Sequence, residues 1–310
     1  MKKEWYAGEI RQVFKRAKKI GLTGLSEFPP VIITCAITGG LHGKEKNPNL
    51  PLSMEEQVKA TYDAYNAGAS IVHIHTRNPK NLSQMSDDVE TYKEINRRIR
   101  EKCPEIIINN TFVGARSYWP NKATEPPMRI SAEARPELAS LDLIKGLFGE
   151  RVFAQTFSDA TENLKILEKY GCKPELGIFD PGDFKILHQL VDHHLVQAPY
   201  WIQCVFNDLG AYSLLEYLGI YEKIIPEDSL LSVLGVGPAQ TPICALSLLM
   251  GHHVRVGLED NVYYHRGELA KSNAQLVERI VRIAHDLGRP IASPKEARTM
   301  MGLGSPREYN

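Results

Sequence analysis

The sequence predicts an α/β protein of the (β/α)8-barrel, or TIM-barrel, class. Eight short apolar segments rich in Val and Ile alternate along the chain with longer segments of helical period. The short segments are apolar almost throughout, as parallel strands buried on both faces are. A dinucleotide-binding fingerprint is missing, because Gly235-Val236-Gly237 lacks the third glycine and lies far from the N-terminus. A closed parallel barrel is therefore favoured over an open doubly wound sheet.

Period and end signals assign the individual elements. The expected strands are Val31–Ile37, Ser70–His75, Glu105–Asn110, Leu138–Leu143, Leu176–Phe179, Trp201–Phe206, Leu230–Leu234 and Val254–Leu258. The expected helices are Met54–Ala67, Asp87–Lys102, Glu162–Tyr170, Asp183–His194, Ala211–Tyr221, Thr241–Met250 and Gly267–Leu287. Ser53 and Glu56 predict a capping box, whereas Thr241 and Pro242 predict an N-cap with a first-turn proline. The proline-rich segment Gly114–Pro136 is expected to be a long loop.

Length and charge limit the domain organisation and the partners. The chain has 310 residues, 43% of them hydrophobic, which suffices for a single barrel. We expect residues 1–30 to form an N-terminal helical extension and residues 31–310 a single catalytic barrel. Lys plus Arg and Asp plus Glu both number 37, so the net charge gives no attraction to nucleic acid or to an anionic membrane. A small-molecule substrate is expected instead.

Cysteine usage and the N-terminal residues indicate the compartment. The five cysteines are scattered and none forms a C-x-x-C pair, which argues against a disulfide framework and against a thiolate zinc site. Met1–Ile20 is charged and amphipathic and lacks the continuous apolar core of a secretion signal. We therefore expect a cytoplasmic protein.

A His-x-His motif at the second expected strand is the most informative short pattern. Side chains alternate along a strand, so His73 and His75 face the same side, and Ile74 faces the other. At the C-terminal end of a barrel strand that side is the lumen, where active sites lie. Two imidazoles on one rigid strand are half of a zinc site. The alternative is that they are structural histidines of the barrel interior.

Charged residues at the end of the eighth expected strand can complete such a site. The eighth strand of a barrel closes against the first, so Glu259 can reach the second strand and supply a third ligand, with one coordination position left open. Asp260 is then a candidate base, and Arg255 can hold an anionic substrate group or orient Asp260. The alternative is that Glu259 and Asp260 cap the following helix.

Ordered motifs extend over almost everything after Pro30. They are Ile33–Gly40, Asn49–Pro51, Glu55–Gln57, Ala67–Ala69 with the His-Ile-His segment, Cys103–Ile108, Gly251–Asn261, Ser272–Val277 and Gly288–Pro290. As a series they resemble the β-keto acid cleavage enzymes, whose first described member acts on 3-keto-5-aminohexanoate. The resemblance implies a TIM barrel with Zn²⁺ held by His73, His75 and Glu259.

The same resemblance implies the reaction and further site residues. A β-keto acid and acetyl-CoA would give acetoacetate and an acyl-CoA by an enolate and a retro-Claisen step. Asp260 would remove the proton between the keto and carboxylate groups, and Arg255 would pair with Asp260. Thr111 and Ser140 stand at positions where the family often has substrate-contacting hydroxyl groups. The resemblance also implies a homo-oligomer, and the assembly that it suggests is a tetramer.

Departures from the family pattern bear on the substrate. Gly177 stands where the fifth strand frequently offers an acid that holds an amino group of the substrate, so an amino-bearing substrate is disfavoured. Leu41 replaces a frequent acid, and Phe206–Gly210 and Gly237–Gln240 differ from the usual loops near the CoA pocket. Two alternatives therefore stay open: a CoA-independent, metal-dependent oxo-acid lyase or hydrolase, and a catalytically silent barrel that binds a metabolite.

Overall fold

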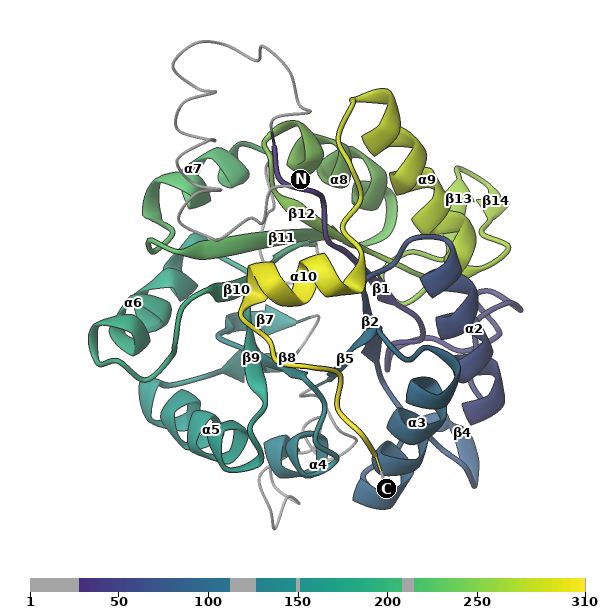
Figure 1. Ribbon diagram of the computed structural model, residues 1–310, viewed down its shortest axis with the longest axis horizontal. Helices are drawn as coiled ribbons and strands as arrows, with labels where there is room; N and C mark the ends of the chain where they lie inside the picture. The colour runs from purple at the N-terminus through teal and green to yellow at the C-terminus, as the bar shows by residue number, and fades with distance from the viewer. Residues whose placement is uncertain (1–27, 112–126, 149–150, 208–214, 310) are drawn as a thin grey trace.

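The structure is a computed structural model that describes residues 28–111, 127–148, 151–207 and 215–309. The predicted N-terminal helical extension lies outside these residues, apart from its last three. Within the described part, the predicted (β/α)8 barrel is confirmed (Figure 1). No described helix has both the length and the apolar character needed to cross a membrane.

Eight parallel strands close the barrel, in the order β1-β12-β11-β10-β9-β6-β5-β2. Their bounds are β1 Ile33–Ala36, β2 Ile71–Ile74, β5 Ile107–Asn110, β6 Leu138–Asp142, β9 Lys173–Ile178, β10 Tyr200–Phe206, β11 Ser229–Gly235 and β12 His253–Val256. Each coincides with a predicted strand to within a few residues. The agreement follows from the runs of Val, Ile and Leu, because both faces of these strands are buried.

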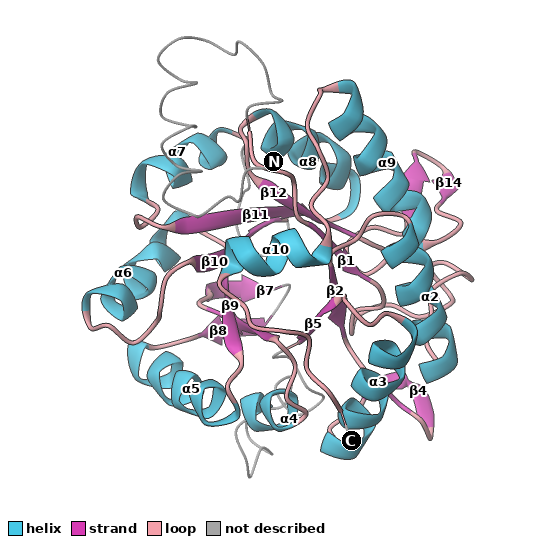
Figure 2. Ribbon diagram, in the orientation of Figure 1, coloured by secondary structure: helices cyan, strands magenta, loops and turns pink. Residues whose placement is uncertain are grey.

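Helices surround the barrel on its outside (Figure 2). They are α2 Met54–Asn66, α3 Val89–Lys102, α4 Pro127–Glu133, α5 Phe157–Tyr170, α6 Phe184–Asp192, α7 Glu216–Ile224, α8 Gln240–Leu249 and α9 Asn273–Asp286, with short 3₁₀ turns η3 Pro181–Asp183 and η4 Gly237–Ala239. A further helix, α10 Pro294–Met301, covers one end of the barrel. Ser53 and Glu56 form the predicted capping box of α2. The predicted N-cap Thr241 is wrong, because α8 continues from η4 and begins one residue earlier with no side-chain cap.

Three hairpins and two helices, α4 and α10, were not predicted from the sequence. The hairpins are β3–β4 (Arg77–Asn78 and Asn81–Met85), β7–β8 (Lys145–Phe148 and Arg151–Ala154) and β13–β14 (Tyr263–His265 and Glu268–Leu269). Helix α4 lies inside the segment predicted as a loop, whose residues 112–126 are outside the described part. Short amphipathic segments next to prolines give weak periodic signals, and their structure depends on what they pack against.

The lumen of the barrel is divided into layers of different polarity. At the N-terminal ends of the strands, apolar side chains form a floor with α10, which lies across this end of the barrel (Figure 1). The floor residues are Ile32, Ile71, Ile107, Leu138, Trp201, Leu230, Ala292, Ala297, Met300 and Met301. Two residues further along each strand, all eight inward side chains are polar and buried: Thr34, His73, Asn109, Ser140, Glu175, Gln203, Ser232 and Arg255. The chemistry-bearing residues therefore begin halfway up the lumen.

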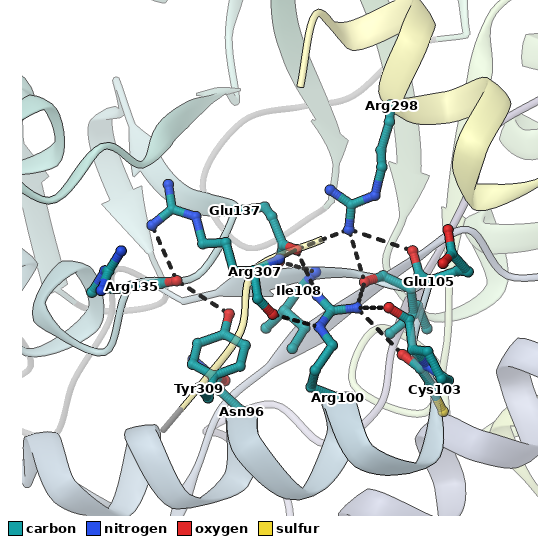
Figure 3. A network of polar contacts seen from close by, with 12 residues as sticks. Asn96, Arg100, Cys103, Glu105, Ile108, Arg135, Glu137, Arg298, Arg307 and Tyr309 are labelled. Atoms are coloured by element: carbon teal, nitrogen blue, oxygen red, sulfur yellow. Dashed lines mark hydrogen bonds and ion pairs between the residues drawn. The ribbon is translucent and has the colours of Figure 1, made fainter. Parts of the chain in front are cut away.

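A buried acid joins the floor to the C-terminal tail. Glu137, just before β6, accepts hydrogen bonds from Arg298 at 2.8 Å and from the backbone N–H groups of Ile108 at 3.0 Å and Arg307 at 3.2 Å, and it also pairs with Arg100. Figure 3 shows the guanidinium groups of Arg100 and Arg298 directed at this carboxylate, while the side chain of Arg307 extends toward Arg135. The network fixes α3, α10 and the tail against the N-terminal ends of the strands.

Candidate metal centre and active site

Two strands on either side of β1 supply the central residues of the site. Strand β1 pairs with β2 through Ala36 and His73, and with β12 through Thr34 and Arg255. The chain that leaves β12 can therefore bend over the end of β1 and bring Glu259 toward the histidines of β2. The Glu259 N–H donates to the carbonyl of Ala36 at 3.2 Å, which fixes this path.

Two glycines allow the chain to follow this path. Gly257 has φ +151°, and a Cβ atom placed on it would lie 1.9 Å from the carbonyl oxygen of Ala36, so any larger residue would push β12 away from β1. Gly39 has φ +67°, and a Cβ atom there would lie 2.6 Å from Cγ of Glu259. Glycine at both positions lets the Glu259 side chain pack directly on the backbone at the mouth of the barrel.

Two imidazoles and one carboxylate converge at this mouth. His75 Nε2 lies 3.2 Å and His73 Nε2 3.5 Å from the same oxygen, Oε1 of Glu259. The three side chains can each offer a ligand atom, and these atoms lie within 4.8 Å of one another. The side chains are only 3%, 9% and 12% exposed for His73, His75 and Glu259, respectively. The structure thus brings together the three residues predicted as metal ligands.

The donor set and its protonation suit a divalent metal. Burial, reinforced by the nearby Arg255, holds the pKa of His73 well below its ordinary value, so this imidazole is neutral and keeps a lone pair. Burial acts against ionisation of Glu259, but His75, Arg255 and His73 together hold its pKa well below the usual range. Its second oxygen, Oε2, is buried without a hydrogen bond to a described residue. Two imidazoles beside an ionised carboxylate form a His₂-carboxylate set that fits zinc or a related metal.

Residues from two neighbouring elements lie beside the histidines. Met85 at the end of the β3–β4 hairpin places its Sδ 3.2 Å from Nδ1 of His75. Asn109 on β5 pairs in register with His73, and Nδ1 of His73 and both side-chain polar atoms of Asn109 are buried without a hydrogen bond to a described residue. A partner on the far nitrogen, as Met85 is for His75, fixes the ring so that Nε2 is presented to a metal. Sequence reasoning missed both residues, because neither belongs to the strand or motif of its histidine.

Arg255 and Asp260 form a paired unit next to the three candidate metal ligands. Arg255 Nε donates to Asp260 Oδ2 at 3.0 Å and its Nη2 donates to Oδ1 at 2.8 Å, while Nη2 also contacts Glu259 Oε1 at 2.6 Å. Burial raises the pKa of Asp260 to about 6 against the opposing effect of Arg255. Asp260 is therefore ionised at neutral pH but is more basic than an ordinary aspartate.

The two predicted hydroxyl contacts occupy different depths. Thr111 follows β5 at the mouth, is 2% exposed, and donates its backbone N–H to Ile74 at 3.0 Å. Ser140 lies deeper, and its Oγ donates to Glu175 Oε1 at 2.9 Å. The hydroxyl proton of Ser140 is thus directed at a buried carboxylate. Contact of Thr111 and Ser140 with substrate stays a prediction.

One acid at the mouth escaped the sequence prediction. Asp142 ends β6 and pairs in register with Gly177 of β9. A Cβ atom placed on Gly177 would lie 2.3 Å from Oδ1 of Asp142, so the carboxylate lies in the space that a side chain at position 177 would take. Position 177 is a glycine, yet the carboxylate of Asp142 occupies the space that a side chain at this position would take.

The fold and these residues define a (β/α)8-barrel with a candidate metal centre at its catalytic end. A family model described as beta-keto acid cleavage enzyme matches residues 30–303. The 3-keto-5-aminohexanoate cleavage enzyme of Fusobacterium nucleatum is 40% identical over 276 residues, which cover 88% of this chain and 98% of that protein. The chain belongs to the β-keto acid cleavage enzyme family, and the predicted family resemblance is confirmed.

A second relative and a solved structure extend the comparison. The 3-oxoadipate:acetyl-CoA acetyltransferase of Cupriavidus necator is 32% identical over 282 residues, covering 89% of this chain and 96% of that protein. The solved ternary complex of ObcA with C4-CoA adduct and oxalate has a TM-score of 0.70 at 18% identity, covers 83% of this chain and 68% of that chain, and supports the fold. Membership of this family makes the chain a carbon–carbon-cleaving acyltransferase.

Proposed function

We propose that this protein is a zinc-dependent enzyme that condenses a β-keto acid with acetyl-CoA to give acetoacetate and an acyl-CoA. The observation that carries the proposal is the convergence of His73 and His75 on Glu259, with Asp260 held beside them by Arg255. Three protein ligands and an open position are typical of catalytic zinc. The acetyl-CoA in the name of the Cupriavidus relative supports the co-substrate.

Asp260 acts as the base in this proposal. A divalent cation held by His73, His75 and Glu259 would supply a Lewis acid for the keto and carboxylate oxygens of the substrate. Asp260 removes a proton from C2, between these two groups, and each of its oxygens keeps a lone pair for that proton while accepting a hydrogen bond from Arg255. Arg255 holds the carboxylate in one orientation throughout the reaction.

The carbon skeleton is exchanged in two steps. The C2 carbanion attacks the thioester carbonyl of acetyl-CoA, a carbon–carbon bond forms, and the CoA thiolate leaves. The thiolate then adds to the C3 carbonyl, the C2–C3 bond breaks, and the acyl group departs as acyl-CoA. The electron pair returns to C2, which takes back the proton from Asp260 to give acetoacetate.

The proposal is tested by measuring acetoacetate released from a panel of short β-keto acids, with and without acetyl-CoA. The protein is stripped with a chelator and reloaded with Zn²⁺, with metal content measured in each sample. We expect release only with both zinc and acetyl-CoA. Products formed without acetyl-CoA would identify an oxo-acid lyase or hydrolase instead. Absence of turnover in metal-loaded protein would contradict the proposal, and a His73→Ala variant that loses metal without any change in turnover would indicate a silent barrel.

A further inference from the structure

Asn273 is a buried side chain of the Ser272–Val277 motif, to which the reaction above gives no role. It is the first residue of α9 and is 1% exposed. Its Oδ1 accepts a hydrogen bond from the backbone N–H of Leu258 at 2.9 Å, and its Nδ2 donates to the carbonyl of Ile37 at 3.0 Å. One amide therefore joins the segment after β12 to the segment after β1, directly beside Glu259.

This amide connects the two halves of the candidate metal centre. On one side, Leu258 directly precedes Glu259 in the chain. On the other side, the backbone N–H of Ile37 donates to the carbonyl of His73 at 3.3 Å. The hydrogen bonds thus run from the segment that carries the carboxylate, through Asn273 and Ile37, to the strand that carries the histidines. They tie the position of Glu259 to that of His73.

The start of α9 is itself fixed by local hydrogen bonds. Ser272 is the N-cap of the helix, and its Oγ accepts from the backbone N–H of Gln275 at 3.1 Å. The side chain of Gln275 in turn accepts from the backbone N–H of Lys271 at 2.8 Å. The short side chain of Asn273 therefore extends from a well-defined helix end. A group on such a rigid element positions its partners more precisely than a group on a loop does.

We propose that Asn273 is a positioning residue that holds Glu259 and the adjacent Asp260 in the arrangement that metal binding and proton transfer require. This inference rests on the proposed function, since it concerns the metal centre and the base of the same site. An asparagine suits the task because its amide offers an acceptor for the N–H of Leu258 and a donor for the carbonyl of Ile37. Aspartate would lack the donor, and alanine would lack both groups.

The test measures metal binding separately from turnover. Zinc affinity is measured by competition with a chelator, and the visible absorption spectrum of Co²⁺-loaded protein reports the geometry of the ligands. Asn273→Ala should lower the zinc affinity by about 10- to 100-fold, the usual effect of removing a group that orients metal ligands. The Co²⁺ bands should shift in the same variant. In zinc-saturated protein kcat/KM should fall by about 10- to 100-fold, because Asp260 is displaced together with Glu259.

Two further variants separate positioning from general damage to the fold. Asn96 is a matched control, because it is also a buried asparagine whose Nδ2 donates to a backbone carbonyl, that of Ala134 at 3.3 Å. Asn96→Ala should lower the Tm but leave the zinc affinity and the Co²⁺ spectrum unchanged. Asn273→Asp keeps the shape of the side chain and the acceptor for Leu258 but cannot donate to Ile37, so it should lower the zinc affinity as well. If Asn273→Ala does not fold, Asn273→Asp decides the question.

The separate measurements distinguish failure of this inference from failure of the proposed function. Zinc that binds the wild type and is held more weakly by the Asn273 variants, without acetoacetate release from any β-keto acid, would support the inference and contradict the proposed function. An unchanged zinc affinity and Co²⁺ spectrum in both Asn273 variants would overturn the inference and leave the proposed function intact. The same would follow if Asn96→Ala changed both quantities as much as Asn273→Ala does.

Discussion

The two ends of the barrel contain carboxylates in opposite situations. At the floor, Glu137 is surrounded by donors from Arg298, Arg100 and the backbone, so its charge is fully compensated (Figure 3). At the mouth, one oxygen of Glu259 has no hydrogen bond to a described residue, and Asp142 has no described partner. In (β/α)8 barrels the N-terminal end serves stability and the C-terminal end serves chemistry.

This difference shows where the fold keeps carboxylate oxygens without hydrogen-bond donors. A carboxylate without donors is costly in a buried site, so an acid that only supports the fold should be completed by the protein itself, as Glu137 is. An acid that receives a metal or a substrate must keep acceptor capacity free. The comparison predicts that substitutions at the mouth reduce function with little loss of stability, and that substitutions at the floor do the reverse.

The largest effect is expected for Asp260→Asn at the mouth. The amide cannot take the C2 proton, so kcat should fall by about 10²- to 10⁴-fold, the usual contribution of a general base. Zinc affinity should change far less, because Asp260 is not one of the three predicted ligands. Steady-state kinetics and metal titration are compared with Asp260→Glu, which keeps a carboxylate. Full activity in the asparagine variant would remove Asp260 from the mechanism.

The next largest effect is a loss of stability, which is expected for Glu137→Ala at the floor. Two arginines, Arg100 and Arg298, would lose their buried counter-charge, and the free energy of unfolding should fall by about 3–5 kcal/mol. Denaturant titration measures this change, with exposed Glu162→Ala as a matched control. Zinc affinity of the remaining folded protein should be unaltered. A stability equal to that of wild type would show that the two ends do not differ in the way proposed.

The smallest effect, and the one that depends on pH, is expected for Asp142→Asn. The folded-state pKa of about 7 exceeds the ordinary value of 3.8, so the native state binds this proton more tightly than the unfolded state does. Wild-type stability is therefore reduced as the pH rises from about 4 to about 7, and the penalty is complete above that range. One pKa unit corresponds to about 1.4 kcal/mol, so the variant should be more stable by about 2–4 kcal/mol at pH 8.

The same measurement at acid pH serves as the control for Asp142. Near pH 4 the aspartic acid is protonated in the native state, so wild type and Asp142→Asn should have nearly the same free energy of unfolding. Urea titrations at several pH values measure the difference directly. A difference that is independent of pH would show that the substitution acts through packing and not through the charge of the carboxylate.

Much of the candidate site follows from local sequence pattern. His73 and His75 share a face because side chains alternate along a strand, and their strand is marked by its apolar residues. Glu259 was placed opposite them because the eighth strand of a barrel closes against the first. These inferences need only the period of a strand and the order of strands, both of which are local or topological properties.

Other parts of the site depend on contacts that no local pattern encodes. Met85 reaches His75 only because the β3–β4 hairpin folds back over β2, and the hairpin itself was not predicted. The misplaced N-cap at Thr241 has a similar origin, since η4 runs directly into α8 and supplies the preceding turn. In both cases a short segment takes the conformation that its neighbours permit.

By itself, the sequence determined the barrel class, the family and the three candidate ligand residues that converge, because strand period, strand order and motifs can be recognised along the chain. The tertiary structure decided which acid reaches the mouth beside Gly177 and which acid is paired with arginines at the floor. Asp142 and Gly177 are 35 positions apart in the sequence, and only the register between β6 and β9 puts the carboxylate of one into the space left by the other. Burial and the absence or presence of donors, which set the properties of Asp142 and Glu137, are likewise defined only by the packed neighbours.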